Sequence, residues 1–259
     1  MRRLAILGAG VVAAVLAFGV TPAGAISYGT LDGTAHPNVG ALVVALPDGP
    51  VSICSGTLVA PTVFLTAAHC VYGDLGTLPL AVTFDSTVTP ASTIYRGHAV
   101  IDPAYTDYKG KGGASDPRDM AVVVLDTAPV GITPAAVAPV GHLDRASLKG
   151  TKVLSVGYGT IRESRKQGPQ GILDNSDRRQ GAGTYLSLQD AWLRTSMNQA
   201  TGNAGTCFGD SGGPHFIGTT LVAITAIGDS QCKAIDIAYR VDTVKAHAFL
   251  DPFLTGAAS

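Results

Sequence analysis

Charged side chains are scarce in this sequence: only 14 % of its 259 residues are Asp, Glu, Lys or Arg. They also balance, because 18 basic and 19 acidic residues leave a formal net charge of −1. A disordered chain combines low hydrophobicity with high net charge, whereas 46 % of these residues are apolar, so intrinsic disorder is excluded. The sequence also lacks a basic cluster, which argues against a nucleic-acid partner.

Metal-binding motifs are absent as well. The four cysteines, at 54, 70, 207 and 232, form no Cys-x-x-Cys pair, and no His-Glu-x-x-His motif occurs. A zinc site is therefore only the minor alternative for them. An even number of cysteines in an exported chain indicates two disulfides, for which four thiols allow three pairings. Spacing alone does not decide between these, and we favour the local pairs Cys54 with Cys70 and Cys207 with Cys232.

The first 25 residues have the pattern of a secretory signal peptide. Arg2 and Arg3 precede an uncharged, mostly apolar run from Leu4 to Val20, and Ala23-Gly24-Ala25 supplies the small residues of a cleavage site. We therefore expect export, with residues 1–25 removed, and no membrane attachment of the remaining chain. An uncleaved anchor is the alternative, because the apolar run is slightly long for a signal.

The rest of the chain is expected to be all-β. Short β-prone segments recur between Gly and Pro residues, which is typical of a sandwich or barrel. A connection without charges at 127–139, with three prolines, separates two β halves. Asp242 is expected to cap a helix that ends at Pro252, and Lys109–Gly113 and Arg162–Gly183 are expected to be loops. The expected strands are Val39–Leu46, Thr62–Thr66, Ile94–Ile101, Met120–Leu125, Lys152–Tyr158, Thr220–Ile227 and Ala234–Val241.

Three motifs carry the parts of a nucleophilic site. A serine hydroxyl attacks a carbonyl only when an imidazole takes its proton, and a carboxylate must orient that imidazole. The glycines around Ser211 allow a tight turn in which the N–H groups of Gly209 and Ser211 converge on an oxyanion. The motifs are Thr66-Ala-Ala-His69-Cys70, Asp119-Met-Ala-Val and Cys207-Phe-Gly-Asp-Ser211-Gly-Gly-Pro214.

In this order, and beside half-cystines, the motifs resemble those of the chymotrypsin-like (trypsin family) serine proteases, which carry Thr-Ala-Ala-His-Cys, Asp-Ile-Ala-Leu and Gly-Asp-Ser-Gly-Gly-Pro. The resemblance spans Ile26 to about Leu250. Because the chain lacks the further disulfides common in animal members, it resembles the secreted bacterial members of the family, with some resemblance to actinobacterial ones. It implies an all-β fold of two antiparallel β-barrels, with the active site in the cleft between them and a short C-terminal helix. The barrels are then expected at about 26–130 and 135–241, and the helix at about 242–251.

The resemblance also implies roles for individual residues. His69 would be the general base, Asp119 its orienting acid, chosen over the nearby Asp116 and Asp126, and Ser211 the nucleophile. The N–H groups of Gly209 and Ser211 would form the oxyanion hole. No metal or cofactor is implied. The expected partners are polypeptide substrates and, in addition, a proteinaceous inhibitor, and the chain is expected to be a monomer.

The pattern of the specificity pocket departs from that of trypsins. Gly205 stands where trypsins have a pocket-base Asp, and Ala226-Ile227-Gly228 corresponds to one pocket wall. Asp236 falls where a pocket glycine is common. If Asp236 points inward, we expect cleavage after basic residues with tolerance of apolar ones. If it points into a surface turn, we expect cleavage after large apolar or aromatic residues.

The resemblance also suggests how the site is activated. In the family, cleavage of the chain before an Ile frees the α-ammonium of that Ile. This ammonium pairs with the acid that precedes the nucleophile, here Asp210. Ile26 directly follows the expected signal-peptidase cut, so we expect that export itself activates the enzyme. An ordinary surface N-terminus is the alternative.

Two other functions compete with this interpretation. The Gly209–Gly213 string also fits Gly-x-Ser-x-Gly, the nucleophile elbow of α/β-hydrolase esterases, but Ser211 comes too late in the chain for that fold. The second is a catalytically inactive, protease-like binding protein, although no member of the expected triad is missing. The other histidines, at 36, 98, 142, 215 and 247, share no spacing and are assigned structural or surface roles.

Overall fold

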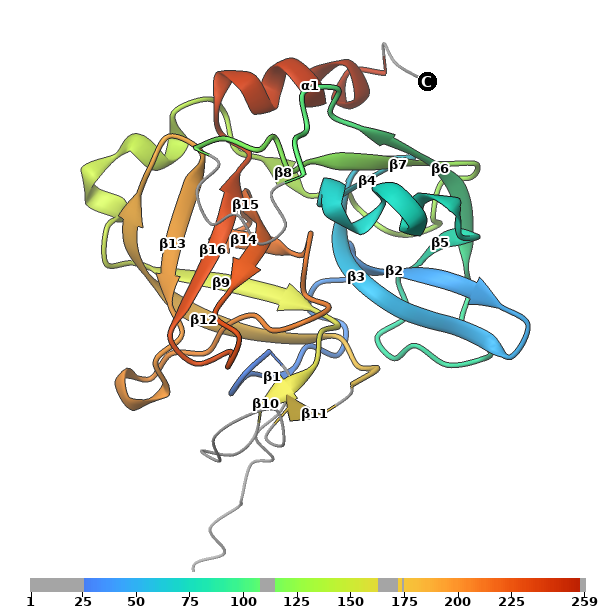
Figure 1. Cartoon of the computed structure of the whole chain (residues 1–259), viewed down its shortest axis with the longest axis horizontal. Coiled ribbons are helices and arrows are strands. Elements are labelled where there is room, and N and C mark those ends of the chain that lie inside the picture. The colour runs from blue at the N-terminus through green and yellow to red at the C-terminus, as the bar shows by residue number, and fades with distance from the viewer. Residues whose placement is uncertain (1–25, 108–114, 163–171, 174, 257–259) are drawn as a thin grey trace, which may run out of the picture.

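The structure is a computed structural model that describes residues 26–107, 115–162, 172–173 and 175–256. The expected signal peptide, residues 1–25, lies outside the described residues, as does the expected loop Lys109–Gly113. Within the described ranges, no helix is both long enough and apolar enough to cross a membrane. The same ranges contain many strands and a single α-helix near the C-terminus (Figure 1).

The first half of the described chain forms a closed antiparallel barrel. Its strands are β2 (Val39–Leu46), β3 (Gly49–Ala60), β4 (Val63–Thr66), β5 (Leu80–Thr83), β6 (Tyr95–Ile101) and β7 (Ala121–Leu125). They pair in the order β2-β3-β4-β7-β6-β5, and β5 pairs with β2 to close the ring. The first six residues of β2 are buried, because this apolar, valine-rich strand packs against the core.

The second half forms another ring of six antiparallel strands. They are β9 (Lys152–Gly157), β12 (Arg179–Leu188), β13 (Trp192–Ser196), β14 (Pro214–Ile217), β15 (Thr220–Gly228) and β16 (Ile235–Arg240). Their order is β12-β13-β16-β15-β14-β9, and β9 pairs with β12 to close the ring. The expected fold of two antiparallel β-barrels is therefore confirmed, and Figure 1 shows the barrels side by side.

Short strands decorate this frame. β1 (Thr30–Leu31) pairs with β12, and β10 (Ile161–Arg162) pairs with β11 (Ile172–Leu173). β8 (Ala136–Val137) lies in the proline-rich connection between the barrels and pairs in parallel with β15 of the second barrel. The connection therefore runs along the second barrel rather than through open solvent.

The structure corrects several details of the sequence-based prediction. Each expected strand overlaps an observed one, but the barrel strands β3, β5, β12, β13 and β14 were missed. The expected loop Arg162–Gly183 is wrong at Arg162 and Ile172–Leu173, which lie in the paired strands β10 and β11. It is also wrong from Arg179 onward, where β12 pairs residue by residue with β9. The first half of β12 contains Gly181-Ala-Gly183, which has little β propensity of its own and forms a strand because partners lie on both sides of it.

The C-terminal helix also differs from the prediction. It is α1 (Val244–Leu254), and its N-cap is Thr243, whose Oγ1 accepts a hydrogen bond from the N–H of Ala246 at 3.0 Å. Asp242 does not cap it, because its carboxylate binds the Leu143 N–H and the Arg240 guanidinium. The helix also continues past Pro252.

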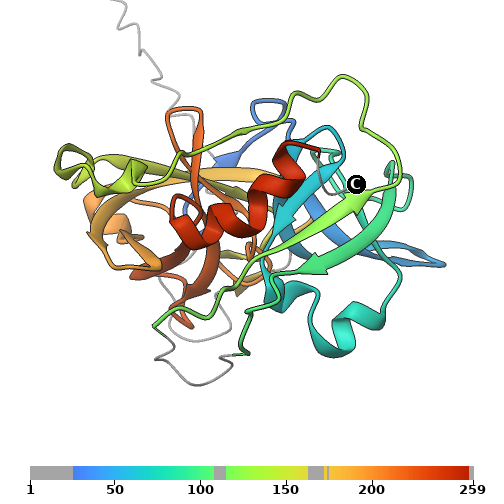
Figure 2. The ribbon, with the colours of Figure 1, turned by 90° about the horizontal axis from the view of Figure 1, so that it is seen from above.

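The two barrels share one apolar cluster. It includes buried residues of the first barrel such as Leu42 and Phe64, and residues of the second such as Val156 and Phe216. Phe249 of α1 belongs to the same cluster, so the helix that follows the second barrel also packs on the first (Figure 2). The relative position of the barrels, and hence of any site between them, is therefore fixed by burial of apolar surface.

Arg178 adds a polar clamp between the barrels. Its side chain is 2 % exposed and donates to the Asp32 carboxylate, to the carbonyls of Val39 and Phe84, and to the hydroxyl of Tyr158. Burial by itself would raise the pKa of Asp32, but hydrogen bonds from His36 and Arg178 outweigh this and hold it below its ordinary value. The buried guanidinium is thus paired with a carboxylate, and each of its three nitrogens donates at least one hydrogen bond.

Candidate active site

His69 lies on the first barrel, in the short 3-10 turn η1 (Ala68–Cys70) that follows β4. The Cys54–Cys70 disulfide ties this turn to β3, and it confirms the first expected cysteine pair. Both sulfurs lie within 4.8 Å of a ring nitrogen of His69. Because these sulfurs are bonded to each other, they are not available as thiolate ligands for a metal.

Asp119 holds His69 through two hydrogen bonds. Its Oδ2 lies 2.8 Å from Nδ1 of the imidazole, and its Oδ1 accepts the backbone N–H of His69 at 3.0 Å. The carboxylate is fully buried, whereas the imidazole is 21 % exposed. A carboxylate on Nδ1 favours the tautomer in which Nδ1 carries the proton, which leaves Nε2 free to accept a proton.

The backbone before β7 directs Asp119 toward His69. Arg118 has a φ of +57° and donates to the Asp102 carboxylate at 2.8 Å. Asp116 points elsewhere, because it accepts hydrogen bonds from Tyr239 and Lys245. Burial would raise the pKa of Asp116, but the bonds to Lys245 and Tyr239 lower it on balance.

Asp126, the other nearby acid, is exposed. Among the three acidic residues considered from the sequence, Asp119 alone is hydrogen-bonded to His69 within the described residues.

Ser211 lies in a turn of the second barrel that is anchored on the first. Its carbonyl accepts the N–H of Ser55 on β3 at 2.8 Å and lies 3.8 Å from Sγ of Cys70. The Oγ of Ser55 donates to the carbonyl of Gly209 at 3.0 Å and accepts the N–H of Tyr158 at 2.9 Å. The turn that carries Ser211 therefore lies beside the turn that carries His69.

Two N–H groups of this turn are available to a ligand. In the described part of the chain, neither Gly209 N–H nor Ser211 N–H donates to another backbone or side-chain group. Gly209 has a φ of +93°, and a Cβ added to it would lie 3.0 Å from the Cα of Gly159. The turn needs glycine at this position both for its left-handed conformation and for this close approach.

Asp210 lies behind the same turn. Its carboxylate is fully buried and accepts the N–H groups of Gly159 and Cys207, each at 2.9 Å. Burial raises the pKa of Asp210 to about 7, against the lowering effect of these two hydrogen bonds. Within the described residues no basic side chain forms a salt bridge with it.

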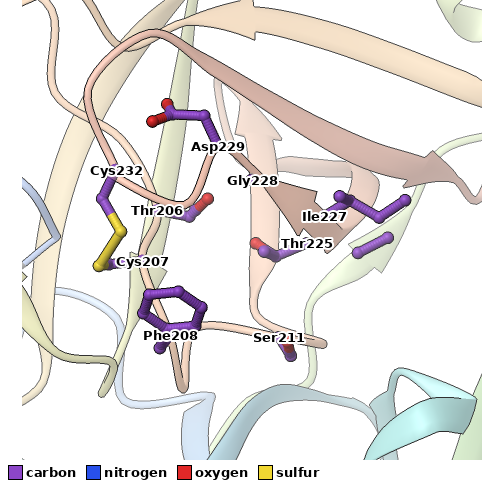
Figure 3. Close-up of a pocket in the computed structure, with 10 residues that line it drawn as sticks. Thr206, Cys207, Phe208, Ser211, Thr225, Ile227, Gly228, Asp229 and Cys232 are labelled. Atoms are coloured by element: carbon purple, nitrogen blue, oxygen red, sulfur yellow. A yellow bond between two sulfur atoms is a disulfide. The ribbon is translucent and has the colours of Figure 1, made fainter. Parts of the chain in front are cut away.

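A pocket with a volume of about 210 Å³ opens beside Ser211 (Figure 3). One side is formed by the Cys207–Cys232 disulfide, the second of the expected cysteine pairs. Other parts of the wall come from β15, which passes on the opposite side of the pocket. The lining residues are Thr206, Cys207, Phe208, Ser211, Thr225, Ala226, Ile227, Gly228, Asp229 and Cys232.

The sequence matches one protein family over most of its length. The Trypsin family profile matches residues 33–247, which is most of the chain. The chain belongs to the trypsin family. This trypsin-family chain is similar to a trypsin from Saccharopolyspora erythraea, with 29 % identity over 208 residues that cover 76 % of this chain and 84 % of the relative. It is also similar to brachyurin from Leptuca pugilator, with 30 % identity over 193 residues that cover 70 % of this chain and 78 % of the relative.

A solved structure supports the fold of this trypsin-family protein. HL collagenase matches it with a TM-score of 0.65, at 16 % identity, over 90 % of this chain and 99 % of the solved chain. The family and the relatives together identify the protein as a serine endopeptidase that hydrolyses polypeptides. The two barrels also exclude an α/β-hydrolase esterase, which is built on a mostly parallel sheet.

Three of the five pocket residues expected from the sequence of this trypsin-family protein line the pocket: Ala226, Ile227 and Gly228. Gly205 does not, because a Cβ at this position would point into the side chain of Met197, 2.1 Å from its Cγ. Asp236 also lies outside the lining and is fully buried. It therefore points neither into the pocket nor into a surface turn.

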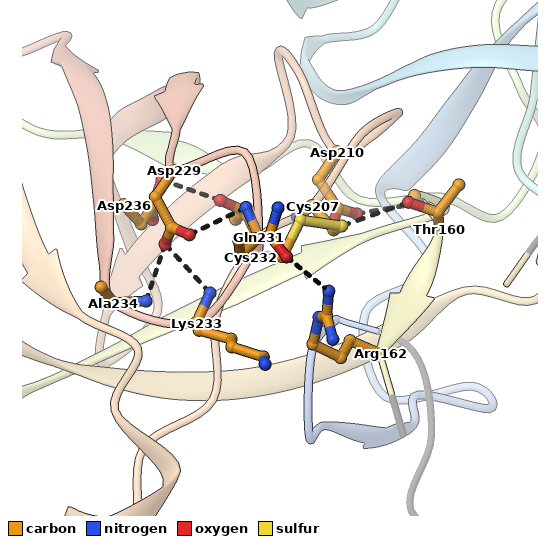
Figure 4. The surroundings of a disulfide bond; sticks show 12 residues. Thr160, Arg162, Cys207, Asp210, Asp229, Gln231, Cys232, Lys233, Ala234 and Asp236 are labelled. Carbon is orange, nitrogen blue, oxygen red and sulfur yellow. Dashed lines mark hydrogen bonds between the residues drawn. A yellow bond between two sulfur atoms is a disulfide. The ribbon is translucent and has the colours of Figure 1, made fainter. Parts of the chain in front are cut away.

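Sequence reasoning missed some residues around the pocket. Asp229 lines it, and its carboxylate accepts the backbone N–H groups of Gln231, Lys233 and Ala234 in the loop that follows (Figure 4). It also accepts the N–H of Ile235. Thr206 lines it as well and directly follows the expected Gly205, so counting along the motif could have found it. Ser55 carried no such signal, because its contact with Gly209 joins residues 154 positions apart.

Proposed function

We propose that Ser211 is the nucleophile of this endopeptidase, His69 its general base and Asp119 the acid that orients His69. In the first step, Ser211 Oγ bonds to the carbonyl carbon of the scissile peptide while its proton passes to Nε2 of His69. The imidazolium then gives this proton to the leaving amine as the C–N bond breaks. Water attacks the resulting acyl-enzyme by the same route, and the acid is released.

The oxyanion of each tetrahedral intermediate would be bound by the N–H groups of Gly209 and Ser211. Donors already oriented toward the developing charge lower the barrier without reorganisation, and loss of one such donor typically costs about 10²- to 10³-fold in turnover. Both groups lack a protein partner in the described residues, which supports this role.

The observation that carries the proposal is the pair of hydrogen bonds between Asp119 and His69, on a turn that packs against Ser211. Binding alone does not require that the buried Asp119 carboxylate fix the tautomer of the partly exposed His69 imidazole, whereas general-base catalysis does. The catalytic assignment is therefore preferred to that alternative.

The pocket beside Ser211 would receive the side chain that precedes the scissile bond, the P1 residue. A volume of about 210 Å³ suits a large side chain. Asp236 is buried behind the lining, and the Asp229 carboxylate is held by backbone N–H groups. No direct salt bridge to a basic P1 residue is supported, and we favour large uncharged side chains.

Export would activate the enzyme. Removal of residues 1–25 would free the α-ammonium of Ile26, a residue that is fully buried in the structure. Pairing of this ammonium with Asp210 would relieve the unfavourable burial of a lone carboxylate. The protein is then a secreted monomer that acts on polypeptides and is open to control by a proteinaceous inhibitor.

A fluorophosphonate probe tests the catalytic proposal. It should label wild-type protein at Ser211, and Ser211→Ala and His69→Ala should each lower turnover of a peptide amide by at least about 10⁴-fold. His98→Ala is the matched control and should leave labelling and turnover intact. Unchanged amide hydrolysis in Ser211→Ala would overturn the assignment.

A further inference from the structure

Thr206 both lines the specificity pocket and contacts the buried Asp236. Its Oγ1 donates to Oδ1 of Asp236 at 2.8 Å. The strand register explains this position, because Asp236 on β16 lies opposite Gly228 on β15, and Gly228 belongs to the pocket wall. The carboxylate therefore lies directly behind the pocket and is separated from it by the threonine.

Two further side chains are hydrogen-bonded to the Asp236 carboxylate. Its Oδ2 accepts a hydrogen bond from Oγ1 of Thr195 at 3.3 Å and is also bonded to Nε2 of His215. Asp236 and His215 are both fully buried. A carboxylate oxygen accepts hydrogen bonds, and Oδ1 is the acceptor for the Thr206 hydroxyl.

The chemistry of the pocket base follows from this arrangement. A threonine hydroxyl has one proton and two lone pairs, and here the proton is committed to Asp236. Toward the pocket the Thr206 oxygen can then only accept, and the carboxylate behind it increases its negative partial charge. A P1 side chain that ends in an N–H or O–H donor fits this surface, whereas an apolar tip would leave the oxygen unpaired.

We propose that Thr206, fixed as a hydrogen-bond acceptor by Asp236, makes this endopeptidase prefer P1 side chains that end in a donor over apolar side chains of similar size. The proposal rests on the proposed function, because it assigns the pocket beside Ser211 to the P1 residue. Asp236 and His215 act through Thr206 and do not touch the substrate.

Two pairs of neutral substrates measure the preference without a change of charge. Peptides that differ only at P1 compare Tyr with Phe and Gln with Met. In wild-type protein, kcat/KM should be about tenfold higher for the Tyr and Gln peptides, which is the effect of one hydrogen bond of about 1.4 kcal/mol. Equal rates within both pairs would overturn the proposal without any variant.

Three variants test the mechanism of the preference. Thr206→Val keeps the shape and removes the hydroxyl, so both the Tyr/Phe ratio and the Gln/Met ratio should fall toward one. Thr195→Val removes another hydroxyl from the same carboxylate but lies outside the pocket, and its ratios should match those of wild type. In Asp236→Asn the amide N–H can donate to the Thr206 oxygen. The hydroxyl proton of Thr206 is then free to point into the pocket, so the preference for P1 donors should be lost.

The outcomes separate this proposal from the catalytic one. If the fluorophosphonate labels the protein but Thr206→Val keeps the wild-type Tyr/Phe and Gln/Met ratios of kcat/KM, the role of Thr206 is overturned. The proposed function is then unaffected. A wild-type preference for Arg or Lys that disappears in Asp236→Asn but survives in Thr206→Val would also overturn it, because Asp236 would then contact substrate itself. Absence of labelling contradicts the proposed function.

Discussion

Ser55 donates a hydrogen bond from its Oγ to the carbonyl of Gly209, at 3.0 Å, across the junction of the two barrels. The N–H of the same residue donates to the carbonyl of Ser211. One fully buried serine of the first barrel thus holds both ends of the turn that would bind the oxyanion. Because the same Oγ also accepts the N–H of Tyr158, its orientation is fixed from two sides.

We predict that Ser55→Ala lowers kcat about tenfold while KM changes little, because one hydrogen bond that positions the turn is lost. Affinity for a peptide aldehyde, which mimics the tetrahedral intermediate, should fall by the same factor. Thr57→Val is the matched control, since Thr57 is buried on the same strand and its hydroxyl has no partner within the described residues. A drop in thermal stability with unchanged kcat per labelled site would contradict the positioning role.

Asp119→Asn should lower kcat by about 10⁴-fold at neutral pH, because an amide next to Nδ1 no longer selects the tautomer that leaves Nε2 free. Amide hydrolysis of a single peptide substrate, normalised to folded protein, measures the effect. Asp116→Asn provides the comparison: this carboxylate binds Lys245 and Tyr239 instead of His69, so kcat should be retained. Equal losses in the two variants would show that neither acid acts through His69.

The state of Asp210 should depend on the N-terminus. In the chain that keeps residues 1–25, burial raises the pKa of Asp210 to about 7, above its ordinary value of 3.8. The folded state then binds more protons than the unfolded state between these pH values, so the free energy of unfolding should fall as pH rises from about 4 to about 7. In a form that begins at Ile26, the new ammonium favours the charged carboxylate, and this fall should be smaller.

Urea titrations at pH 5 and pH 8 of the two forms measure this difference. Only the form that begins at Ile26 should show full peptidase activity at pH 8. N-terminal sequencing of an active form that starts elsewhere, or equal pH dependence of the two forms, would count against activation by export.

Arg178→Met should lower the free energy of unfolding by about 3–5 kcal/mol, because it leaves the buried Asp32 carboxylate without its guanidinium partner. Urea unfolding at pH 7 measures this loss. Arg96→Met is the control, since Arg96 is exposed on β6 and the change there should have little effect. If the two variants lose equal stability, the clamp between the barrels contributes nothing specific.

The sequence by itself determined the elements of this protein that depend on local pattern. His69, Asp119 and Ser211 are embedded in contiguous motifs, and strands such as β2 and β7 consist of apolar, β-branched runs. The order of the motifs was sufficient for the family and for the two-barrel fold. The local disulfide pairs were likewise favoured from the sequence, and the structure contains them.

Only the tertiary structure decided where the Asp236 side chain points, that Gly205 lies outside the pocket lining, and which residue holds the oxyanion turn. Side-chain direction on a strand depends on register, and register is set by partners far away in the chain. The Asp236 carboxylate is held behind the pocket by hydrogen bonds to His215 and Thr195. These hydrogen bonds exist only after the second barrel has closed. The oxygens of a buried carboxylate must accept hydrogen bonds from whichever donors the fold places nearby. The local sequence does not predict where those donors lie.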